Sequence, residues 1–334
     1  MTRLSRQGSV SHTLLWMFLS GLCKSSAFLL PVRQGRLLFS FSSDTVGSDQ
    51  PTSTRYTIDT PPIDPELLQS TVRKNFDNFD RYLQSRPVAA HTLEAFGQFQ
   101  KELALSPTFS GLILDSGCGT GRSSLVLGDL YEDKMIVGVD RSIDRLGRVA
   151  RDLTSWTDDE LEDTLEETNF DNDTSNRQHV QRVRENVILV RAELVHFWRL
   201  WWQSGLAKET EQHYMLYPNP YPKKSRLKQR WYAHPSFPLL LLVTGGKPLI
   251  LRTNWQQYAK EFADAVAYAS ACGDTTEKDA SSVAMNASKL AQRYLSSARG
   301  GATSRKPGDP WTNFEAKYDK IGEATYQLCL RAHD

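Results

Sequence analysis

The sequence is poor in the residues that build metal centres and disulfide frameworks. It has only 4 cysteines in 334 residues, at positions 23, 118, 272 and 329. None of them belongs to a Cys-x-x-Cys pair or lies in a His/Cys cluster. Structural zinc sites and small disulfide-stapled folds depend on such spacings. Neither class is therefore supported; we expect reduced thiols and no metal site.

A strong excess of charge is also missing. The 40 basic and 39 acidic residues leave a formal net charge of +1, so the chain lacks the global cationic character of many nucleic-acid-binding proteins. Any contact with a polyanion must then come from a local patch. The hydrophobic share of 40% and the charged share of 24% are ordinary for a globular protein. The length allows one large domain or two small ones.

Acidic residues are absent from the first 43 positions, the first one being Asp44. Arg3 and Arg6 precede a short apolar run at 14–19, which ends at small residues 25–27. This pattern is typical of a secretory signal, and the run is too short to span a bilayer comfortably. The basic, serine-rich stretch that follows is typical of a transit peptide.

Signal followed by transit peptide resembles the bipartite plastid presequences of diatoms and related algae. The resemblance implies a presequence at 1–45, a plastid (chloroplast) location and no stable membrane association after its removal. A plain signal peptide, an uncleaved anchor, the secretory pathway and the mitochondrion stay open as alternatives. A polar, proline-bearing linker follows at 46–64.

The rest of the chain divides into a helical extension and a main domain. In the stretch 65–106, aromatic residues recur at three- and four-residue spacing, which predicts helices that cap the core. The main domain covers 107–334. It contains an acidic stretch at 153–180, interpreted as a solvated insertion, and a candidate insertion at 272–310. The aromatic helix that includes Phe197 and Trp201 is expected to serve core packing.

A glycine-rich turn is the first motif that indicates a ligand. The apolar strand candidate 112–114 ends in Asp115, and Ser-Gly-Cys-Gly-Thr-Gly follows at 116–121 before a helix start. Strand, glycine turn and helix bring backbone N–H groups against a nucleotide-like ligand. A second strand candidate ends in Asp140, about 20 positions later, which suits hydrogen bonds to ribose hydroxyls. A third strand candidate, 186–191, precedes Glu193, which is suited to accept from an adenine amino group.

A dinucleotide fold needs a further glycine where this chain has Arg122. The pattern present, Asp-x-Gly-x-Gly-x-Gly, is similar to motif I of class I S-adenosylmethionine methyltransferases. That resemblance implies S-adenosyl-L-methionine as cofactor, held by Asp115, Gly117, Gly119, Gly121, Asp140 and Glu193. A nicotinamide enzyme and a glycine turn without a ligand stay open as alternatives.

A proline-framed loop is the second motif. The strand candidate 213–216 is followed by Tyr-Pro-Asn-Pro-Tyr-Pro at 217–222. Open α/β sheets bind ligands beyond the carboxyl ends of their strands, and three prolines make this loop stiff enough to hold Asn219 near a reacting atom. A run of cations suited to the phosphates of RNA comes next: Lys223, Lys224, Arg226, Lys228 and Arg230.

Further motifs follow in a fixed order. They are His-Pro-Ser-Phe at 234–237, Gly-Gly at 245–246, Thr-Asn at 253–254, Thr-Asn-Phe-Glu at 312–315 and Gly322. Together with Pro-Asn-Pro-Tyr-Pro-Lys-Lys at 218–224, they resemble the tRNA (guanine-N7)-methyltransferase family of bacterial type, from about residue 110 to the end. The resemblance implies an α/β fold with a seven-stranded Rossmann-like sheet and helices on both faces. It also implies methyl transfer to N7 of a guanine in the tRNA variable region. The substrate residues would be the five cations with Asn254, Thr312 and Glu315, and the catalytic residue Asn219.

The chain departs from the family at two acidic positions, where it has Asn219 and Asn254. Guanine N7 is a lone-pair acceptor, so catalysis is mainly alignment and electrostatics, and an amide offers no compensating charge. Two alternatives therefore stay open: a methyltransferase of the same fold that acts on an exocyclic amine, and a non-catalytic tRNA-binding relative. The oligomeric state is not determined by the sequence, and a monomer is favoured.

Overall fold

The computed structural model describes residues 62–106, 109–146, 148, 179–274 and 282–333. All of them belong to one structural unit, Thr54–Asp334. The predicted presequence 1–45 lies outside the described residues, as do most of the predicted linker 46–64 and of the acidic insertion 153–180. In the described part, no helix is both long enough and apolar enough to cross a membrane.

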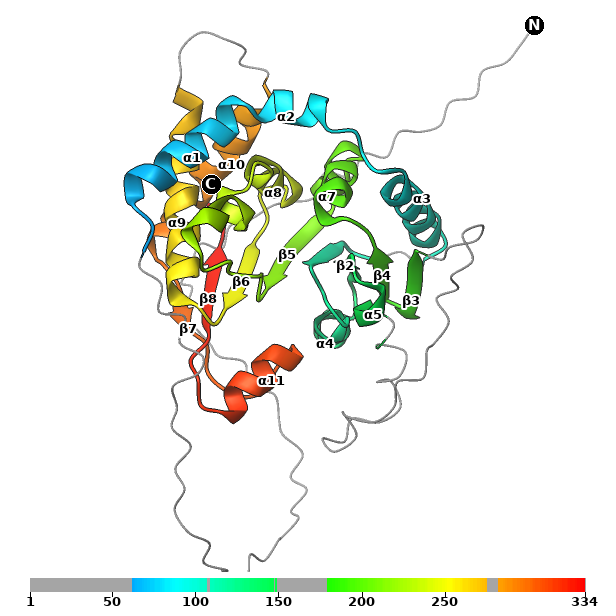
Figure 1. Ribbon diagram of the computed structural model, residues 1–334. Helices are drawn as coiled ribbons and strands as arrows, with labels where there is room; N and C mark the ends of the chain where they lie inside the picture. Colours follow the sequence, from blue (N-terminus) through cyan, green and yellow to red (C-terminus); the bar gives the residue numbers. More distant parts are fainter. Residues whose placement is uncertain (1–61, 107–108, 147, 149–178, 275–281, 334) are drawn as a thin grey trace, which may run out of the picture. The chain divides into compact units, whose positions relative to one another are not determined.

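An eight-stranded sheet forms the centre of the unit, with the order β3-β4-β2-β1-β5-β6-β8-β7 (Figure 1). Strands β4, β2, β1, β5 and β6 are parallel, whereas β3, β8 and β7 each pair antiparallel with a neighbour. The bounds are β1 Leu112–Ser116, β2 Met135–Asp140, β3 Val180–Arg184, β4 Val187–Arg191, β5 Thr210–Leu216, β6 Leu249–Thr253, β7 Thr303–Ser304 and β8 Tyr326–Leu330.

The predicted α/β class is confirmed: the sheet has helices on both faces and its central strands are buried apolar runs, as a parallel sheet requires. The sheet has one strand more than the seven expected, namely the edge strand β3. This strand pairs with β4 through a two-residue turn and is mostly only half-buried. Its sequence, Val-Gln-Arg-Val-Arg, lies at the end of the acidic stretch, so the apolar run that marks a central strand is missing.

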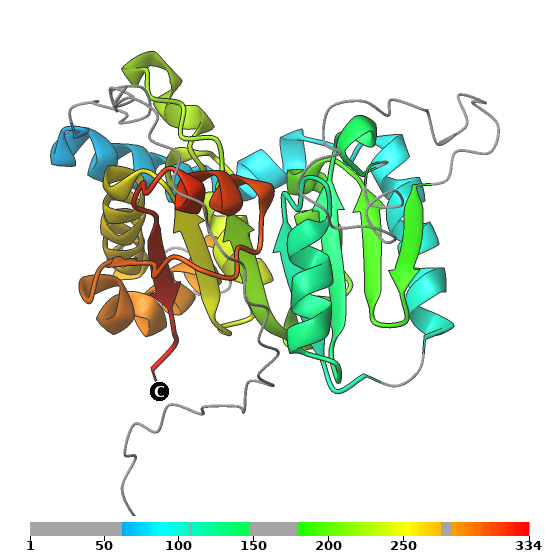
Figure 2. The same cartoon turned by 90° about the horizontal axis from the view of Figure 1, so that it is seen from below.

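The helices cover the two faces unequally (Figures 1 and 2). One face carries α3, α7, α8, α9 and α10, and α1 and α2 pack against three of these helices, α8, α9 and α10. The other face carries α4, α5 and α11. The bounds are α1 Pro65–Asp77, α2 Phe79–Ser85, α3 Ala90–Ala104, α4 Arg122–Leu130, α5 Ile143–Leu146, α7 Leu194–Gln203, α8 Phe237–Val243, α9 Gln256–Ser270, α10 Val283–Arg299 and α11 Asn313–Lys320. Short 3-10 helices lie at Leu206–Lys208 (η1), Lys224–Gln229 (η2), Trp231–Ala233 (η3) and Cys272–Asp274 (η4).

Aromatic residues join the N-terminal helices to the sheet domain. Phe96 and Phe99 of α3 pack on Phe197 of α7, with ring centroids 5.3 and 5.7 Å apart, and Phe99 stacks on Trp201 at 5.7 Å. All four rings are buried. Aromatic pairs of this kind contribute about 0.5–1.5 kcal/mol each beyond the burial of their area. The expectation that the aromatic residues of α7 serve core packing is thus confirmed.

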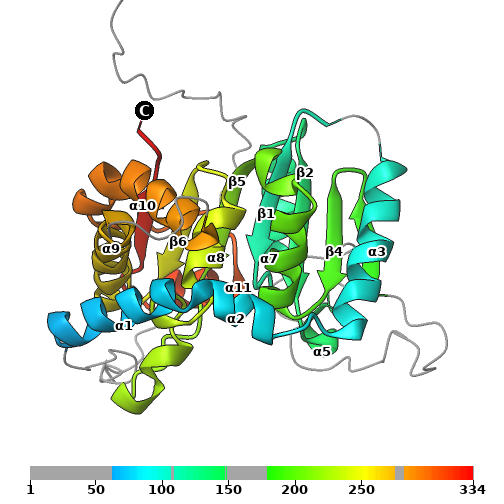
Figure 3. The same ribbon diagram turned by 90° about the horizontal axis from the view of Figure 1, so that it is seen from above.

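Helix α10 lies in the stretch 272–310, which the sequence marks as a candidate insertion. Its Ala287, Ala291 and Tyr294 are fully buried, and the helix packs along α9 and α8 (Figure 3). Ser282 caps its start by accepting a hydrogen bond from the N–H of Met285 at 3.1 Å. This part of the stretch is therefore packed into the core, and its status as an insertion stays a prediction.

Candidate functional site at the carboxyl edge of the sheet

The parallel strands end at one edge of the sheet, and most of the predicted site residues follow those ends. Asp115 lies at the end of β1, Asp140 ends β2, Glu193 follows β4, Asn219 follows β5 and Asn254 follows β6. Strand β1 lies between β2 and β5. The chain runs outward in one direction through β2 and β4 and in the other through β5 and β6. The glycine turn and the proline loop therefore leave adjacent strands at the switch point where α/β sheets bind ligands.

The glycine turn is open above its backbone. Gly117, Gly119 and Gly121 have φ values of 78°, 61° and 81°, which other residues rarely adopt. The N–H groups of Gly117 and Cys118 donate to the carbonyl of Val139 on β2, at 2.8 and 3.1 Å. A Cβ atom added at Gly117 or Gly119 would meet no described protein atom within 4 Å. The structure thus leaves room for a ligand along the turn.

Asp115 lies under this turn with one oxygen uncompensated. Its Oδ2 accepts hydrogen bonds from the hydroxyls of Ser123 and Ser124 at the start of α4, at 2.6 and 2.7 Å. Its Oδ1 is buried and has no hydrogen-bond partner within the described ranges. Burial raises the pKa of Asp115 to about 6, and the two serine hydroxyls hold it from rising further. At pH 7 a negative charge therefore lies under the turn, and no described cation pairs with it.

Asp140 ties the end of β2 to the turn. Its Oδ2 accepts from the N–H of Gly119 at 3.1 Å, and its Oδ1 accepts from the N–H of Ser142 at 2.8 Å. The guanidinium of Arg145 lies 3.4 Å from Oδ1. A carboxylate has about four lone-pair sites, so Asp140 keeps acceptor capacity for a ligand at the turn.

A cavity of about 300 Å³ opens beside the ends of β2 and β4. Glu193 lines it, and its carboxylate also caps α7 by accepting from the N–H of His196 at 2.9 Å. The sequence indicated Glu193 but not the others, because they come from separate elements that only the fold brings together. The other lining residues are His91, Arg141, His179, Arg191 and Ala192.

The proline loop presents Asn219 to solvent. Tyr217 and Tyr221 both have a positive φ, 52° and 43°, which is unusual for residues with a side chain. The Oδ1 atom of Asn219 accepts from the N–H of Tyr221 at 3.2 Å, which closes an Asx turn. The loop is thus held in a single tight shape with Asn219 exposed at its tip.

Four of the five predicted cations lie on the surface directly after this loop. The side chains of Lys223, Lys224, Arg226 and Lys228 are exposed on and beside η2, whereas Leu227 is buried and anchors the helix. They form a cationic surface at the same edge as the glycine turn.

The prediction for the fifth cation, Arg230, is wrong. Its side chain is 2% exposed and forms an ion pair with Glu261 at 2.9 Å. A buried guanidinium cannot reach the phosphates of an RNA. Its remaining N–H groups donate to the proline loop and to Tyr232, so its contacts are internal.

The predicted base contact of Glu315 is also wrong. Glu315 is fully buried, where it forms an ion pair with Arg252 at 2.9 Å and accepts from the Tyr217 hydroxyl at 3.1 Å. Its other oxygen accepts from the N–H of Trp311 at 2.6 Å. The hydroxyl of Thr312 accepts from the N–H of Glu315 at 3.0 Å, as an N-cap does. Both residues thus fix the start of α11; Glu315 does not face a substrate, whereas Thr312 is half-buried and its substrate role stays a prediction.

Helix α11 instead presents an aromatic ring that the sequence did not single out. Phe314 is 38% exposed; it stacks on Tyr318 at 4.5 Å and touches the ring of Tyr217 at 4.8 Å. Asn254 donates from Nδ2 to the hydroxyl of Tyr318 at 2.9 Å. The predicted residue Asn254 is therefore half-buried against α11, and its side-chain oxygen Oδ1 has no hydrogen-bond partner among the described residues.

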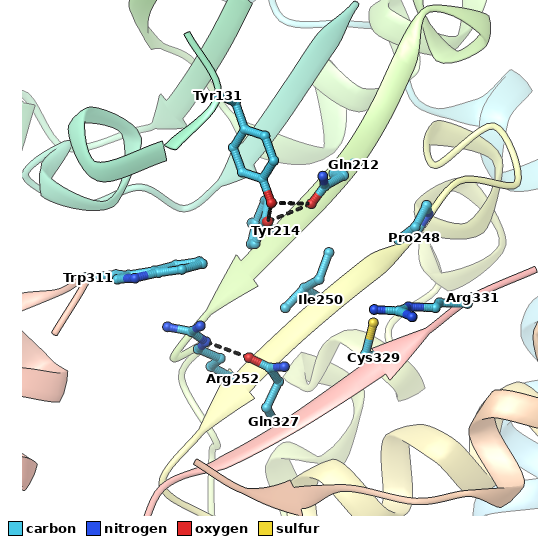
Figure 4. Close-up of a pocket in the computed structure, with 10 residues that line it drawn as sticks. All are labelled: Tyr131, Gln212, Tyr214, Pro248, Ile250, Arg252, Trp311, Gln327, Cys329 and Arg331. Atoms are coloured by element: carbon cyan, nitrogen blue, oxygen red, sulfur yellow. Dashed lines mark hydrogen bonds between the residues drawn. The ribbon is translucent and has the colours of Figure 1, made fainter. Parts of the chain in front are cut away.

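A second cavity, of about 320 Å³, lies on the sheet face formed by β5, β6 and β8 (Figure 4). In Figure 4 the hydroxyls of Tyr131 and Tyr214 meet the amide of Gln212, and Trp311 lies near Arg252, whose guanidinium is 3.7 Å from the ring centroid. None of the predicted site residues lines this cavity. No residue of the glycine turn lines this cavity either.

Comparisons with known proteins give only distant likenesses. No protein-family model and no curated protein matches the chain. Among solved structures, it is similar to an antibiotic-related methyltransferase, with 10% identity, 69% of this chain and 92% of that chain covered and a TM-score of 0.37. A 16S rRNA (adenine(1408)-N(1))-methyltransferase from Catenulisporales acidiphilia, solved with its cosubstrate SAM, is 13% identical, with 71% of this chain and 91% of that chain covered and a TM-score of 0.35. The 16S rRNA methyltransferase KamB is 10% identical, with 75% of this chain and 96% of that chain covered and a TM-score of 0.34. These identities and TM-scores assign neither a family nor a substrate to the chain.

Proposed function

We propose that this protein is an S-adenosyl-L-methionine-dependent RNA methyltransferase that modifies N7 of a guanine in the variable region of tRNA. One observation carries the proposal. An open glycine turn follows β1, above a carboxylate whose Oδ1 has no partner in the described part of the chain. The neighbouring strand β5 leads into a stiff, exposed loop and then into four surface cations. A cationic, nucleotide-like methyl donor and an anionic polynucleotide fit these two halves.

The residues at the turn suit the donor. S-adenosyl-L-methionine supplies a methyl group on a positively charged sulfonium. The backbone of Gly117 and Gly119 allows close approach of a ligand, and Asp140 has acceptor capacity for ribose hydroxyls. The cavity beside Glu193 is the place for the adenine ring. The negative charge of Asp115 attracts the cationic part of the donor.

The residues at the proline loop suit a nucleobase. Guanine N7 carries a lone pair in the neutral base, so no side chain needs to remove a proton there. The task of the chain is alignment, and a loop held by prolines and by the Asn219–Tyr221 hydrogen bond is suited to it. Asn219 has acceptor capacity left on its amide oxygen, and within the described ranges its two amide hydrogens have no partner, so they can serve the base.

The RNA strand itself is proposed to cross the four exposed cations that follow the loop. Phosphate contacts of this type position an RNA without reading its sequence. Phe314, exposed on α11, adds an aromatic surface at the same edge. This set replaces the one derived from the sequence, because Arg230 and Glu315 are internal.

A second reaction is favoured by the residue at the tip of the loop. Asn219 lies exposed, and its amide oxygen is able to accept from an exocyclic amine as well as from guanine. The same residue supports the third candidate, a tRNA-binding relative without catalysis, because it lacks the charge of a carboxylate. The product of the reaction separates all three.

The test is methyl transfer to total tRNA, followed by mass spectrometry of the nucleosides. We expect N7-methylguanosine from the wild type. Gly119→Ala should lose transfer, because the added methyl group strains the turn and occupies the ligand space. Gly205→Ala is the matched control: Gly205 also has a positive φ, 87°, and open space around it, but lies before β5 at the opposite edge.

The outcomes separate the candidates. An N-methylated exocyclic amine as product supports the second reaction, and tRNA binding without any methyl transfer supports the third. Strain in the left-handed region costs each glycine variant about 1–2 kcal/mol. Equal loss of transfer in both variants would therefore be explained by strain alone and would contradict the proposal that the glycine turn binds the methyl donor.

We propose further that the protein acts in the plastid, on the strength of the acid-free N-terminal 43 residues. Residues 1–60 fused to a fluorescent protein should direct it to the plastid of an alga with complex plastids. Fluorescence in the secretory pathway or the mitochondrion contradicts this location without affecting the proposed chemistry.

A further inference from the structure

We propose that Arg230, Glu261 and Tyr232 form a buried clamp that positions the proline loop for methyl transfer. This inference rests on the proposed function and assigns positioning residues to the same site. The clamp holds two backbone carbonyls of the loop. The Nε atom of Arg230 donates to the carbonyl of Tyr221 at 3.1 Å, and Nη2 donates to the carbonyl of Pro222 at 3.2 Å.

The loop needs such donors because its own backbone has few. Prolines at 218, 220 and 222 have no N–H group, so half of the six loop residues cannot donate. Tyr221 is half-buried and Pro222 is exposed, and both of their hydrogen bonds to Arg230 are partly buried. The forked guanidinium supplies two at once, which the single ammonium of a lysine does with poorer geometry.

The clamp is anchored in the core. The Nη1 atom of Arg230 donates to Glu261 Oε2 and to the Tyr232 hydroxyl, both at 2.9 Å, and the Tyr232 hydroxyl also donates to Glu261. The guanidinium lies 4.7 Å from the ring centroid of Trp255. Its position is therefore determined on every side by α9, η3 and the residues after β6.

Glu261 also joins the clamp to the N-terminal extension. Its Oε1 accepts from the N–H of Ile63, just before α1, and from Gln257 on its own helix, both at 3.0 Å. The carboxylate thus has four donors, including Arg230. A buried ion pair gives little net stability compared with apolar residues. We therefore attribute to the Arg230–Glu261 pair the role of fixing the geometry of the loop.

Two hydrogen bonds connect Arg230 through Tyr221 to Asn219, the proposed catalytic residue. Arg230 holds the carbonyl of Tyr221, a residue with φ 43°, and the N–H of the same Tyr221 donates to Asn219 Oδ1. A residue in the left-handed region keeps that conformation only when its surroundings determine it. Without the clamp, Tyr221 relaxes and Asn219 loses the partner that sets its orientation.

The test compares Arg230→Lys and Tyr232→Phe with Tyr294→Phe. Tyr294 is also a fully buried tyrosine with a hydrogen-bonded hydroxyl, which meets Thr244 at 2.7 Å and the carbonyl of Lys247. It lies on α10, away from the loop. All three variants should lower the melting temperature. Only the two clamp variants should lower kcat for tRNA methylation, by at least tenfold, while KM for tRNA and the salt dependence of tRNA binding change less than threefold.

Hydrogen exchange gives a second readout that does not depend on activity. The amide of Tyr221 should exchange at least tenfold faster in Arg230→Lys than in the wild type or Tyr294→Phe. If kcat and exchange in the clamp variants equal those of Tyr294→Phe, the clamp proposal is overturned. A smaller salt dependence in Arg230→Gln, which removes the charge, also overturns it, because Arg230 would then contact RNA. A wild type that methylates no RNA contradicts the proposed function alone, and exchange then decides on the clamp.

Discussion

Replacing Asp115 by asparagine should separate stability from cofactor binding. Asp115 is fully buried with Oδ1 unpartnered in the described structure, and burial raises its pKa to about 6 from 3.8. A carboxyl group whose pKa is raised in the fold resists ionisation there. The folding stability lost by ionising this carboxyl is therefore zero below pH 3.8, grows as the pH rises, and reaches its full value above pH 6. Asparagine keeps the shape and an acceptor for Ser123 and Ser124 but carries no charge.

The magnitude follows from the shift. Two units of pKa correspond to about 3 kcal/mol, which Asp115→Asn recovers at pH 7. A buried amide group without an acceptor costs about 1–3 kcal/mol, so the variant should be between equally stable and about 2 kcal/mol more stable. A cationic ligand that returns the pKa to its ordinary value gains the same ~3 kcal/mol, or roughly 100-fold in affinity. By this linkage, wild-type affinity should fall about tenfold between pH 7 and pH 5.

Calorimetric titration with S-adenosyl-L-methionine tests the predicted change in affinity, and a urea melt at pH 7 tests the predicted change in stability. We expect Asp115→Asn to bind the donor roughly 10- to 100-fold more weakly, with no fall between pH 7 and pH 5. Binding of 5′-methylthioadenosine, which lacks the sulfonium and ammonium charges, should be nearly unchanged. The reasoning is refuted if the variant binds the donor as tightly as the wild type, or if both ligands lose affinity equally.

Three further predictions concern single features of the structure. Asn219→Asp should raise kcat for tRNA by about 3- to 30-fold in a methyl-transfer assay, because a charged acceptor is stronger than a neutral one; a slower variant contradicts this. Lys223→Ala with Lys224→Ala should reduce the salt slope of tRNA binding by about two between 50 and 200 mM salt, and an unchanged slope means that these cations do not touch RNA. Burial lowers the pKa of His213 to about 3 from 6.5, so the contribution of His213 to stability falls as the pH drops below 6.5. Relative to the wild type, His213→Gln should therefore be more stable at pH 4 than at pH 6.5 in denaturant melts, and an equal stability difference at the two pH values would contradict this.

The parts of the fold that the sequence predicts are those with strong local patterns. Strands β1, β2 and β4 are apolar runs that end in polar residues, and the glycines of the turn stand where φ is positive. Strand β7 has two residues, and β3, Val-Gln-Arg-Val-Arg, has neither an apolar run nor a regular alternation, so neither gives such a signal. Helix α10 owes its place in the core to contacts with α8 and α9, which no local pattern shows.

The errors at Arg230 and Glu315 have different causes. In a run of cations, spacing does not tell which side chain points inward, and the partner of Arg230 lies 31 residues further along, at Glu261. For Thr312 and Glu315 a local signal was present. A threonine followed three residues later by glutamate is a sequence signature of a helix start, and the structure has α11 begin there.

The most direct test of the account is a crystal structure of the protein with S-adenosylhomocysteine. We expect the ligand along Gly117–Gly121, with its ribose hydroxyls at Asp140, its adenine in the cavity beside Glu193 and its amino group toward Asp115. A ligand found in the cavity over β5, β6 and β8, or side chains filling the space above the turn, would contradict it.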